Sequence, residues 1–280
     1  MKFGLDMPTT GEFADARVLA ELAAEAEAAG WDGFFLWDTL LGGGDQPEPT
    51  LDPWIALTAL ALNTRLIRLG LTVLALPRHR PWLVARRLAN LDQLSGGRMI
   101  CAVGLGHSDR DFAALGEESA LPARAAKLDE GLAVLAGLWS GEPFTFAGAH
   151  YTLTDVTLLP RPIQSPRIPL WVAGGWPRRG PFRRAARWDG ALVKSIHHET
   201  RRWLALDDFR DCVTFLRERR GTQDGAFDIV ASGEAPDDPA EARAKMAALE
   251  EAGATWWTEE GLGWSLDELR QRIRIGPPRG

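Results

Sequence analysis

A glycine pair followed by arginines is the segment whose residue types best suit ligand chemistry. Residues 173–184 read AGGWPRRGPFRR, and Gly174-Gly175 separates an apolar stretch from a helical one. Glycines leave backbone amides open to an anion at the start of a helix, and Arg178 and Arg179 add charge that suits a phosphate. The alternative is a tight turn at the glycines with both arginines in solvent. The residues alone leave both interpretations open.

A second glycine-rich segment follows another apolar stretch. Residues 99–103 are typical of a buried strand, and Gly104-Leu105-Gly106 comes next, where backbone can approach a ligand closely. The following His107-Ser108-Asp109-Arg110-Asp111 contains residue types that ligate metals. No second histidine pair with ligand spacing accompanies them. We therefore predict no metal site.

Asp38 is the ionisable side chain best placed for proton chemistry. It follows the apolar stretch 33–37, and parallel α/β enzymes place reactive groups at the carboxyl ends of strands. The alternative is that Asp38 caps the next segment. His197-His198 also follows a predicted strand, and there we favour an exposed loop. The basic loop Arg78-His79-Arg80 can meet an anion, although a solvated turn between prolines is the commoner outcome.

The elements that carry these residues alternate regularly along the chain. Residues 66–76 and 99–103 are two apolar strands, and residues 82–94 between them have helical spacing. Two strands joined by a crossover helix form a βαβ unit, which implies parallel pairing. Ser95-Gly96-Gly97 ends the helix, because glycine adopts the left-handed backbone that helix ends favour.

The same alternation recurs through the whole chain. We predict strands at 2–7, 33–37, 66–76, 99–103, 168–173, 191–195, 227–232 and 254–258. We predict helices at 14–29, 52–63, 82–94, 108–115, 123–139, 178–187, 201–219, 239–252 and 266–275. Segments 144–146 and 151–157 predict a β-hairpin outside the main sheet. The alternation favours a (β/α)8 TIM barrel over a doubly wound sheet, with loop insertions at the C-terminal face.

Length and composition limit the function classes. The chain has 280 residues, which suits one domain spanning 1–280. A net charge of −6 argues against general nucleic-acid binding. The sequence has no long apolar run, so we expect neither a secretory signal nor a membrane span. Cys101 and Cys212 lie in apolar patterns typical of reduced, buried thiols, so we expect a cytoplasmic protein.

Several motifs resemble the bacterial luciferase-like family of flavin-dependent oxidoreductases. They are GWDGFFLWDT at 30–39, LDQLSGGR at 91–98, GLG at 104–106, DFAALG at 111–116, AHYTLTDVTLLPRP at 149–162, IPLWVAGG at 168–175 and RRAARWDG at 183–190. The resemblance covers most of the chain to about Gly190. It implies a (β/α)8 barrel that uses FMN or the deazaflavin F420.

The resemblance also implies where the cofactor lies. Relatives hold the flavin phosphate near the strand end at residues 173–175, and several carry a bulge with a non-proline cis peptide behind the flavin ring. In this chain that bond falls at Thr72–Val73, the alternative being a regular buried strand. Trp37, Leu74 and Trp176 are expected to wall the pocket, with structural packing as the alternative for Trp176. The residues expected to bind the cofactor are Thr72, Val73, Val103, Gly104, Gly106, Gly174, Gly175 and Trp176.

Two positions depart from the family pattern. Many relatives have a catalytic histidine where this chain has Thr39, and luciferase has a phosphate-binding arginine near the position of Leu105. The roles of that histidine and that arginine therefore cannot be assigned to Thr39 and Leu105. We expect His107, or water held by Asp38 and Thr39, to replace the histidine, so Asp38 and His107 are the predicted catalytic residues.

The expected function is therefore oxidation or reduction of an unidentified small organic substrate. FMN is slightly preferred, as a reduced flavin that reacts with oxygen, and F420 hydride transfer is the alternative. A barrel lyase or isomerase acting on a phosphorylated substrate is also possible, with Lys194 as its base if that side chain points inward at the mouth. The second alternative is a flavin-binding protein with reduced activity, or a structural subunit of a luciferase-like heterodimer, and the missing histidine at Thr39 supports it. Relatives often dimerise through outer helices, which predicts a homodimer.

Overall fold

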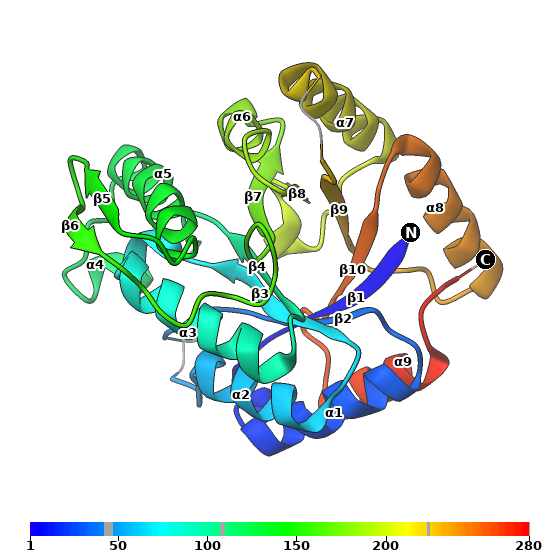
Figure 1. Cartoon of the computed structure of the whole chain (residues 1–280). Coiled ribbons are helices and arrows are strands. Elements are labelled where there is room, and N and C mark those ends of the chain that lie inside the picture. The colour runs from blue at the N-terminus through cyan, green and yellow to red at the C-terminus, as the bar shows by residue number, and fades with distance from the viewer. Residues whose placement is uncertain (42–46, 107–109, 223–224, 280) are drawn as a thin grey trace.

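The structure, a computed structural model that describes residues 1–41, 47–106, 110–222 and 225–279, contains a closed parallel barrel (Figure 1). Its strands are β1 (Lys2–Met7), β2 (Gly33–Leu36), β3 (Arg68–Leu74), β4 (Met99–Val103), β7 (Leu170–Trp176), β8 (Gly190–Ser195), β9 (Asp228–Gly233) and β10 (Trp256–Glu260). They pair in the order β1-β10-β9-β8-β7-β4-β3-β2, and β2 pairs with β1 to close the ring. The predicted (β/α)8 barrel is confirmed, and a doubly wound sheet is excluded.

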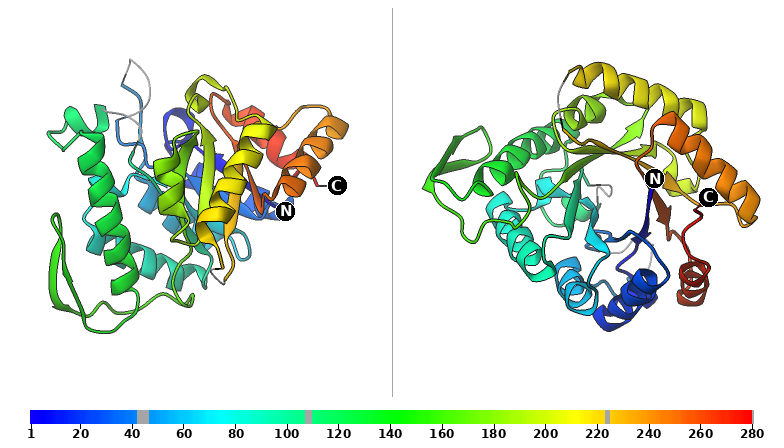
Figure 2. Two further views of the ribbon diagram at one scale, coloured as in Figure 1. Left: turned by 90° about the horizontal axis from the view of Figure 1, so that it is seen from above. Right: turned by 45° about the vertical axis from the view of Figure 1, so that its right-hand side comes forward.

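Helices surround the barrel (Figure 2, right). They are α1 (Ala16–Ala28), α2 (Pro53–Asn63), α3 (Pro81–Ser95), α4 (Arg110–Ala113), α5 (Leu121–Leu138), α6 (Arg179–Ala185), α7 (Leu206–Arg220), α8 (Pro239–Ala252) and α9 (Leu266–Ile275). The last helix lies beside the first, where Arg270 of α9 is 3.3 Å from the Glu21 carboxylate of α1 (Figure 1). The first and last helices therefore meet in the outer layer, as closure of the barrel requires.

The lower part of the barrel interior is filled by aromatic and aliphatic side chains. Phe35, Trp171 and Trp256 pack with ring centroids 5.4–5.8 Å apart, in tilted and edge-on arrangements. Strands β3 and β4 approach closely at Gly70, where a Cβ atom would lie 1.9 Å from the Ile100 carbonyl oxygen. Because this end is packed solid, a ligand has room only toward the carboxyl ends of the strands.

Strand β3 contains the predicted bulge. Its pairing with β4 shifts register between Leu71 and Leu74, and the Thr72–Val73 peptide bond is cis. The expectation taken from the family resemblance is thus confirmed over the alternative of a regular strand.

The predicted hairpin is also confirmed. Strands β5 (Phe144–Ala147) and β6 (Thr152–Val156) pair antiparallel in a separate two-stranded sheet beside α5 (Figure 1). Both cysteines are buried and unpaired, as expected, and burial raises the pKa of each thiol.

Some predicted boundaries are wrong for identifiable reasons. The strand expected at 66–76 ends at Leu74, because Leu76–Arg78 forms a 3-10 turn. The helix expected from residue 201 begins at Leu206, because Arg201 has a left-handed backbone, with φ of 54°. The strand expected at 254–258 continues to Glu260, which is buried inside the barrel instead of being solvated.

Candidate functional site

Three of the predicted strand ends meet at the carboxyl-terminal mouth of the barrel. Strand β4 lies between β3 and β7, and Val103 pairs with Leu74 on one side and Val172 on the other. A Cβ atom at Gly104 would lie 2.9 Å from Val73 Cγ1 and 3.8 Å from Ala173 Cβ. The bulge, the strand-four glycine and the segment before Gly174 therefore form one contiguous surface.

Solvent reaches this surface. Side chains that point into the barrel are fully buried in its lower part, whereas Val73, Ala173, Gly175 and Lys194 are half-buried. Val73 and Ala173 lie on β3 and β7, the strands on either side of β4 and the Gly104 that follows it, and Lys194 lies on β8, next to β7. A strip of small or glycine residues that crosses adjacent strand ends fits a flat ring system lying against backbone. The residues present thus suit a flavin-type cofactor.

The predicted role of Gly174-Gly175 as a turn at the mouth of a helix is wrong. Both glycines lie inside β7, paired with Val193 and Lys194 of β8, and α6 begins only at Arg179. Close packing accounts for both residues, because a Cβ at Gly174 would lie 2.5 Å from Pro181 Cβ and one at Gly175 2.9 Å from Ile196 Cγ2. The two glycines do lie near the barrel mouth, as predicted, but they do not form the start of a helix.

Packing explains two other residues that were predicted to bind the cofactor, Trp176 and Gly106. The Trp176 ring lies 5.6 Å from Phe182 of α6 and 6.0 Å from Phe215 of α7, on the outer side of the barrel. The packing interpretation of Trp176 is therefore correct, and its expected contact with the cofactor is not supported. Gly106 has a left-handed φ of 79°, and a Cβ there would lie 2.7 Å from the Phe112 ring.

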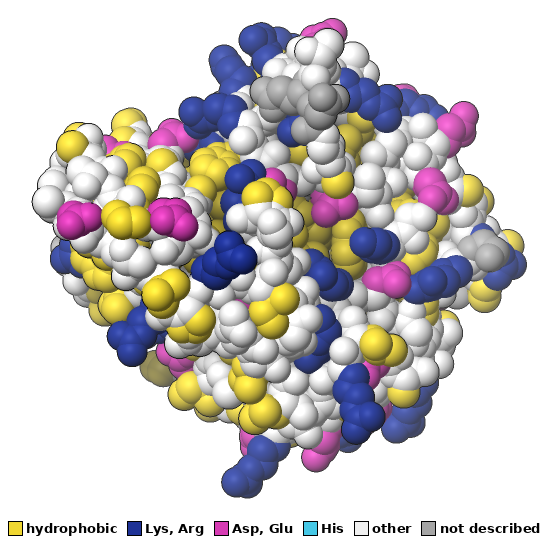
Figure 3. Space-filling model, viewed as in Figure 1, with side chains coloured by type: hydrophobic (Ala, Val, Ile, Leu, Met, Phe, Trp, Pro, Cys, Tyr) yellow, Lys and Arg dark blue, Asp and Glu magenta, His cyan; other side chains and the backbone are white. Residues whose placement is uncertain are grey.

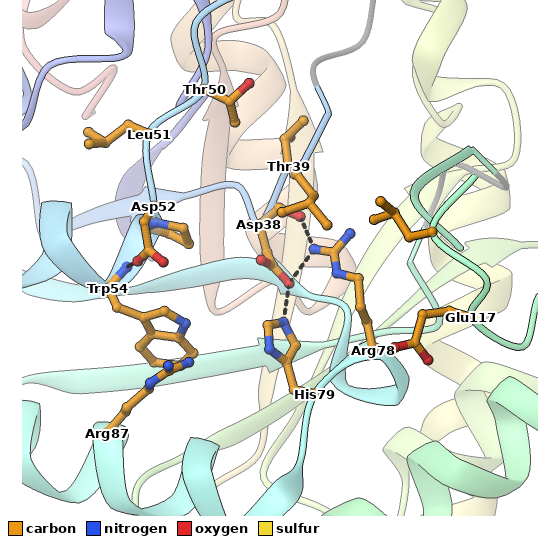
Figure 4. Close-up of a pocket in the computed structure, with 13 residues that line it drawn as sticks. Asp38, Thr39, Thr50, Leu51, Asp52, Trp54, Arg78, His79, Arg87 and Glu117 are labelled. Carbon is orange, nitrogen blue, oxygen red and sulfur yellow. Dashed lines mark hydrogen bonds and ion pairs between the residues drawn. The ribbon is translucent and has the colours of Figure 1, made fainter. Parts of the chain in front are cut away.

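Asp38 is the centre of a charged cluster at the rim of the mouth, which we call the rim cluster. Its carboxylate lies 2.9 Å from Arg78 Nη2 and 2.8 Å from His79 Nε2 (Figure 4). It also accepts a 3.0 Å hydrogen bond from the Ala75 amide. Arg78 also donates to the Asp38 carbonyl at 2.7 Å and to Asp111 Oδ2 at 2.8 Å. The expected solvated turn is therefore wrong for Arg78 and His79, and only Arg80 of this loop is exposed.

The rim cluster faces a cavity of about 350 Å³. His79 and Thr39 both line it, and the His79 ring stands edge-on to Trp54 with centroids 6.4 Å apart (Figure 4). An imidazole from the end of β3 thus occupies the cavity beside the threonine that replaces the family histidine. Paired with a carboxylate, this imidazole has the arrangement of a general acid or base.

The other histidines named from the sequence have different outcomes. His107 lies outside the described residues, and the candidate metal cluster that begins with it does so in part. Across the described chain, His, Cys, Asp and Glu side chains form no group of three or more suited to a metal ion. His197 is exposed as expected, whereas the half-buried His198 ring lies 2.9 Å from the Ser195 carbonyl oxygen.

Sequence reasoning missed a second charged group, the floor cluster, inside the barrel. Lys194 Nζ lies 2.6 Å from Glu260 Oε1 and 3.2 Å from Asp6 Oδ2, and the Thr72 hydroxyl donates to Asp6 Oδ1 at 2.5 Å. Burial, only partly opposed by Lys194, raises the pKa of Asp6 to about 7. Burial alone would lower the pKa of Lys194, but the Glu260 and Asp6 carboxylates raise it.

The floor cluster bears on the lyase or isomerase alternative. Lys194 does point inward, which is the feature that would favour a lysine base. A base or Schiff-base lysine needs a lowered pKa, however, and this ammonium is held between two carboxylates. The geometry therefore argues against that chemistry.

Lys and Arg side chains are scattered over the face in Figure 3 instead of forming one basic patch. In the part of the chain that the structure covers, every helix is too short or too polar to cross a bilayer.

Comparison with known proteins identifies similar folds and sequences. The family model described as luciferase-like monooxygenase matches residues 1–274. An F420-dependent glucose-6-phosphate dehydrogenase from Amycolatopsis mediterranei is 32% identical over 165 residues, which cover 58% of this chain and 48% of that protein. This chain thus matches about half the length of that relative.

Solved structures extend the similarity of fold to nearly the whole chain. The monooxygenase RslO1 from Streptomyces bottropensis superposes with a TM-score of 0.81 at 21% identity, covering 98% of this chain and 97% of that one. The oxygenating constituent of 3,6-diketocamphane monooxygenase from Pseudomonas putida, in complex with FMN, has a TM-score of 0.75 at 16% identity and covers 98% and 95%. At these identities the similarity establishes the fold.

Proposed function

The chain belongs to the luciferase-like monooxygenase family, and from this premise we propose that it is an oxidoreductase that binds a flavin-type cofactor across the barrel mouth. The observation that carries the proposal is the group of half-buried residues Val73, Ala173 and Gly175, which lie on strand ends around the buried Gly104. The substrate is a small organic molecule that enters through the cavity beside His79 and Thr39.

The cofactor, once bound, supplies the two-electron chemistry, and the side chains around it supply binding, orientation and proton transfer. Val73 and Gly104 would form the surface behind the ring, next to the cis bond at the bulge, whereas Thr72 and Val103 are buried and would support that surface from behind. Gly175 continues that surface on β7. The backbone near Gly106 and Gly174 holds the rest of the molecule.

The proton-transfer role falls to His79 with Asp38. Asp38 contacts His79 Nε2 at 2.8 Å, which fixes the orientation of the ring. Arg78 holds the Asp38 carboxylate from its other side at 2.9 Å. His79 thus replaces the family histidine absent at Thr39, and the proposal of a catalytically reduced protein loses its main support.

The identity of the cofactor is the finer part of the proposal. The sequence alone slightly favoured FMN. The relative with 32% identity is named for F420, whereas the structure with FMN shares 16% identity. We therefore rank F420 first and FMN second, with hydride transfer as the expected reaction for the former and oxygenation for the latter.

Anaerobic titration with each cofactor tests the proposal. Oxidised F420 and FMN would be added separately to the whole protein, and the absorption bands and fluorescence recorded at increasing protein concentration. We expect saturable binding with a shifted band for one of them, and substrate-dependent bleaching or oxidation only with that cofactor. Binding of neither cofactor would overturn the proposed function.

We also propose a single-domain, cytoplasmic homodimer. The apolar side chains Ile55 and Leu62 on α2 and Leu83 and Leu94 on α3 are exposed on the outer layer, which supports a subunit contact there. Light scattering with Ile55→Glu and Leu62→Glu together tests this. Wild-type dimers that become monomers are expected, and a monomeric wild type would contradict it.

A further inference from the structure

The floor cluster is a buried ionic group without a role in the account so far. Asp6, Glu260 and Lys194 come from β1, β10 and β8, and all three point into the barrel. The side chains of Asp6 and Glu260 are 0% and 3% exposed, whereas that of Lys194 is 11% exposed. Lys194 is thus the member of the cluster that a ligand at the mouth can reach.

The cluster adjoins the proposed ring surface on two sides. Lys194 pairs in register with Gly175 of β7. Asp6 accepts a hydrogen bond from Thr72, the residue on the amino side of the cis bond. A flat molecule that covers Val73 and Gly175 therefore has one edge beside Lys194.

Lys194 has more hydrogen-bond donors than its two carboxylate partners use. An ammonium has three N–H donors, of which one is donated to Asp6, while Glu260 Oε1 lies at ion-pair distance, so at least one donor remains after both carboxylates. A protonated lysine with a third donor facing an accessible site is suited to bind an acceptor oxygen or a developing negative charge.

Resting on the proposed function, we propose that Lys194 is a cofactor-binding residue whose third N–H donates to an acceptor on the ring at the barrel mouth. Asp6 and Glu260 are positioning residues that keep the ammonium charged and fix its direction. The interaction strengthens when that edge of the ring carries negative charge, so it favours the reduced cofactor.

Protonation of Asp6 adds a pH dependence. The groups that face Asp6 are Lys194, Glu260 and the Thr72 hydroxyl, and burial raises the pKa of Asp6 to about 7. Below that pH the three charged side chains sum to zero, and above it they sum to −1. An anionic ring edge is repelled by the extra charge, so affinity for the reduced cofactor falls as pH rises through about 7.

The test measures dissociation constants of the oxidised and reduced cofactor for matched variants. Lys194→Met removes the donor but leaves two buried carboxylates unpaired, which endangers folding. The triple variant Asp6→Asn/Lys194→Met/Glu260→Gln, which we call the neutralised variant, removes the same donor without leaving a buried carboxylate unpaired. Lys2→Met is the control, because Lys2 lies over Trp256 at the opposite end of the barrel. Circular dichroism confirms that each variant is folded.

We expect reduced-cofactor binding to weaken about tenfold to a hundredfold in the neutralised variant, a loss typical of a hydrogen bond to a charged group. The Lys2→Met control should change less than twofold, and Asp6→Asn should flatten the pH dependence. A folded neutralised variant that binds like the wild type would overturn the Lys194 assignment alone. A wild type that binds neither cofactor would overturn the assignment together with the proposed function.

Discussion

The rim cluster and the floor cluster share one plan and differ in how their cation is used. In each, a cation lies between two carboxylates: Arg78 between Asp38 and Asp111, and Lys194 between Asp6 and Glu260. Arg78 makes contacts to both acids and to the Asp38 carbonyl. Lys194, in contrast, contacts the two carboxylates from inside the barrel, beside the proposed ring surface.

The difference indicates a division of labour. Asp38, Arg78 and His79 of the rim cluster lie in the segments that follow β2 and β3, and an imidazole is the commonest general acid or base in enzymes. The floor cluster is built on barrel strands, which hold side chains more rigidly than loops do. We infer that the rim moves protons and the floor orients the ligand.

The largest effect is expected at the rim, for His79→Ala. Loss of a general acid or base typically lowers turnover by about 10²–10⁴-fold, while the cofactor dissociation constant should change little because the ring lies over β3, β4 and β7. Steady-state kinetics and cofactor titration measure the two separately. His150→Ala, on the exposed hairpin loop, is the matched control. Equal turnover in both variants would remove His79 from the mechanism.

The next effect concerns the stability of the rim. Arg78→Met leaves the buried Asp38 carboxylate without its arginine partner, and breaking a buried pair costs about 3–5 kcal/mol. Arg187→Met removes a largely exposed pair with Asp129, for which less than about 1 kcal/mol is expected. Urea unfolding of the two variants gives the comparison. Similar losses in both would mean that the rim pair is effectively solvated.

A smaller effect, spread over pH, is expected from the floor. The pKa of Asp6 is raised by burial from 3.8 to about 7, so the folded protein binds a proton that the unfolded chain has released between these values. Stability contributed by this group is therefore present at low pH and decreases as pH rises from about 4 to about 7. The slope is at most about 1.4 kcal/mol per pH unit.

Unfolding in urea at several pH values measures this slope. Asp6→Asn should flatten it, whereas Asp207→Asn, at an exposed i,i+3 ion pair on α7, should leave it unchanged. A wild type whose free energy of unfolding rises through this range, with no difference in Asp6→Asn, would show that Asp6 is ionised in the folded protein.

The barrel could be predicted from sequence because its signals are local. Each strand is a short apolar run, and each helix has its own spacing and end signals, so the order of elements identified the fold. The cis bond at Thr72–Val73 came from resemblance alone, since no property of those two residues predicts it.

The clusters could not be predicted because their members are distant in the chain. His79 looks like a solvated loop residue until the end of β2 brings Asp38 within 2.8 Å. Asp6 and Glu260 are single acids in apolar strands, and only barrel closure pairs them through Lys194. Gly174-Gly175 resembled a turn because the sequence does not reveal that β7 continues to Trp176 and pairs with β8 there.

The most direct test of the account is a crystal structure of the protein with whichever cofactor it binds in titration. We predict that the ring lies against Val73, Gly104 and Ala173, with Lys194 Nζ within hydrogen-bond distance of a ring acceptor and His79 facing the open side. A ring bound away from these strand ends, or a phosphorylated substrate in its place, would contradict the account.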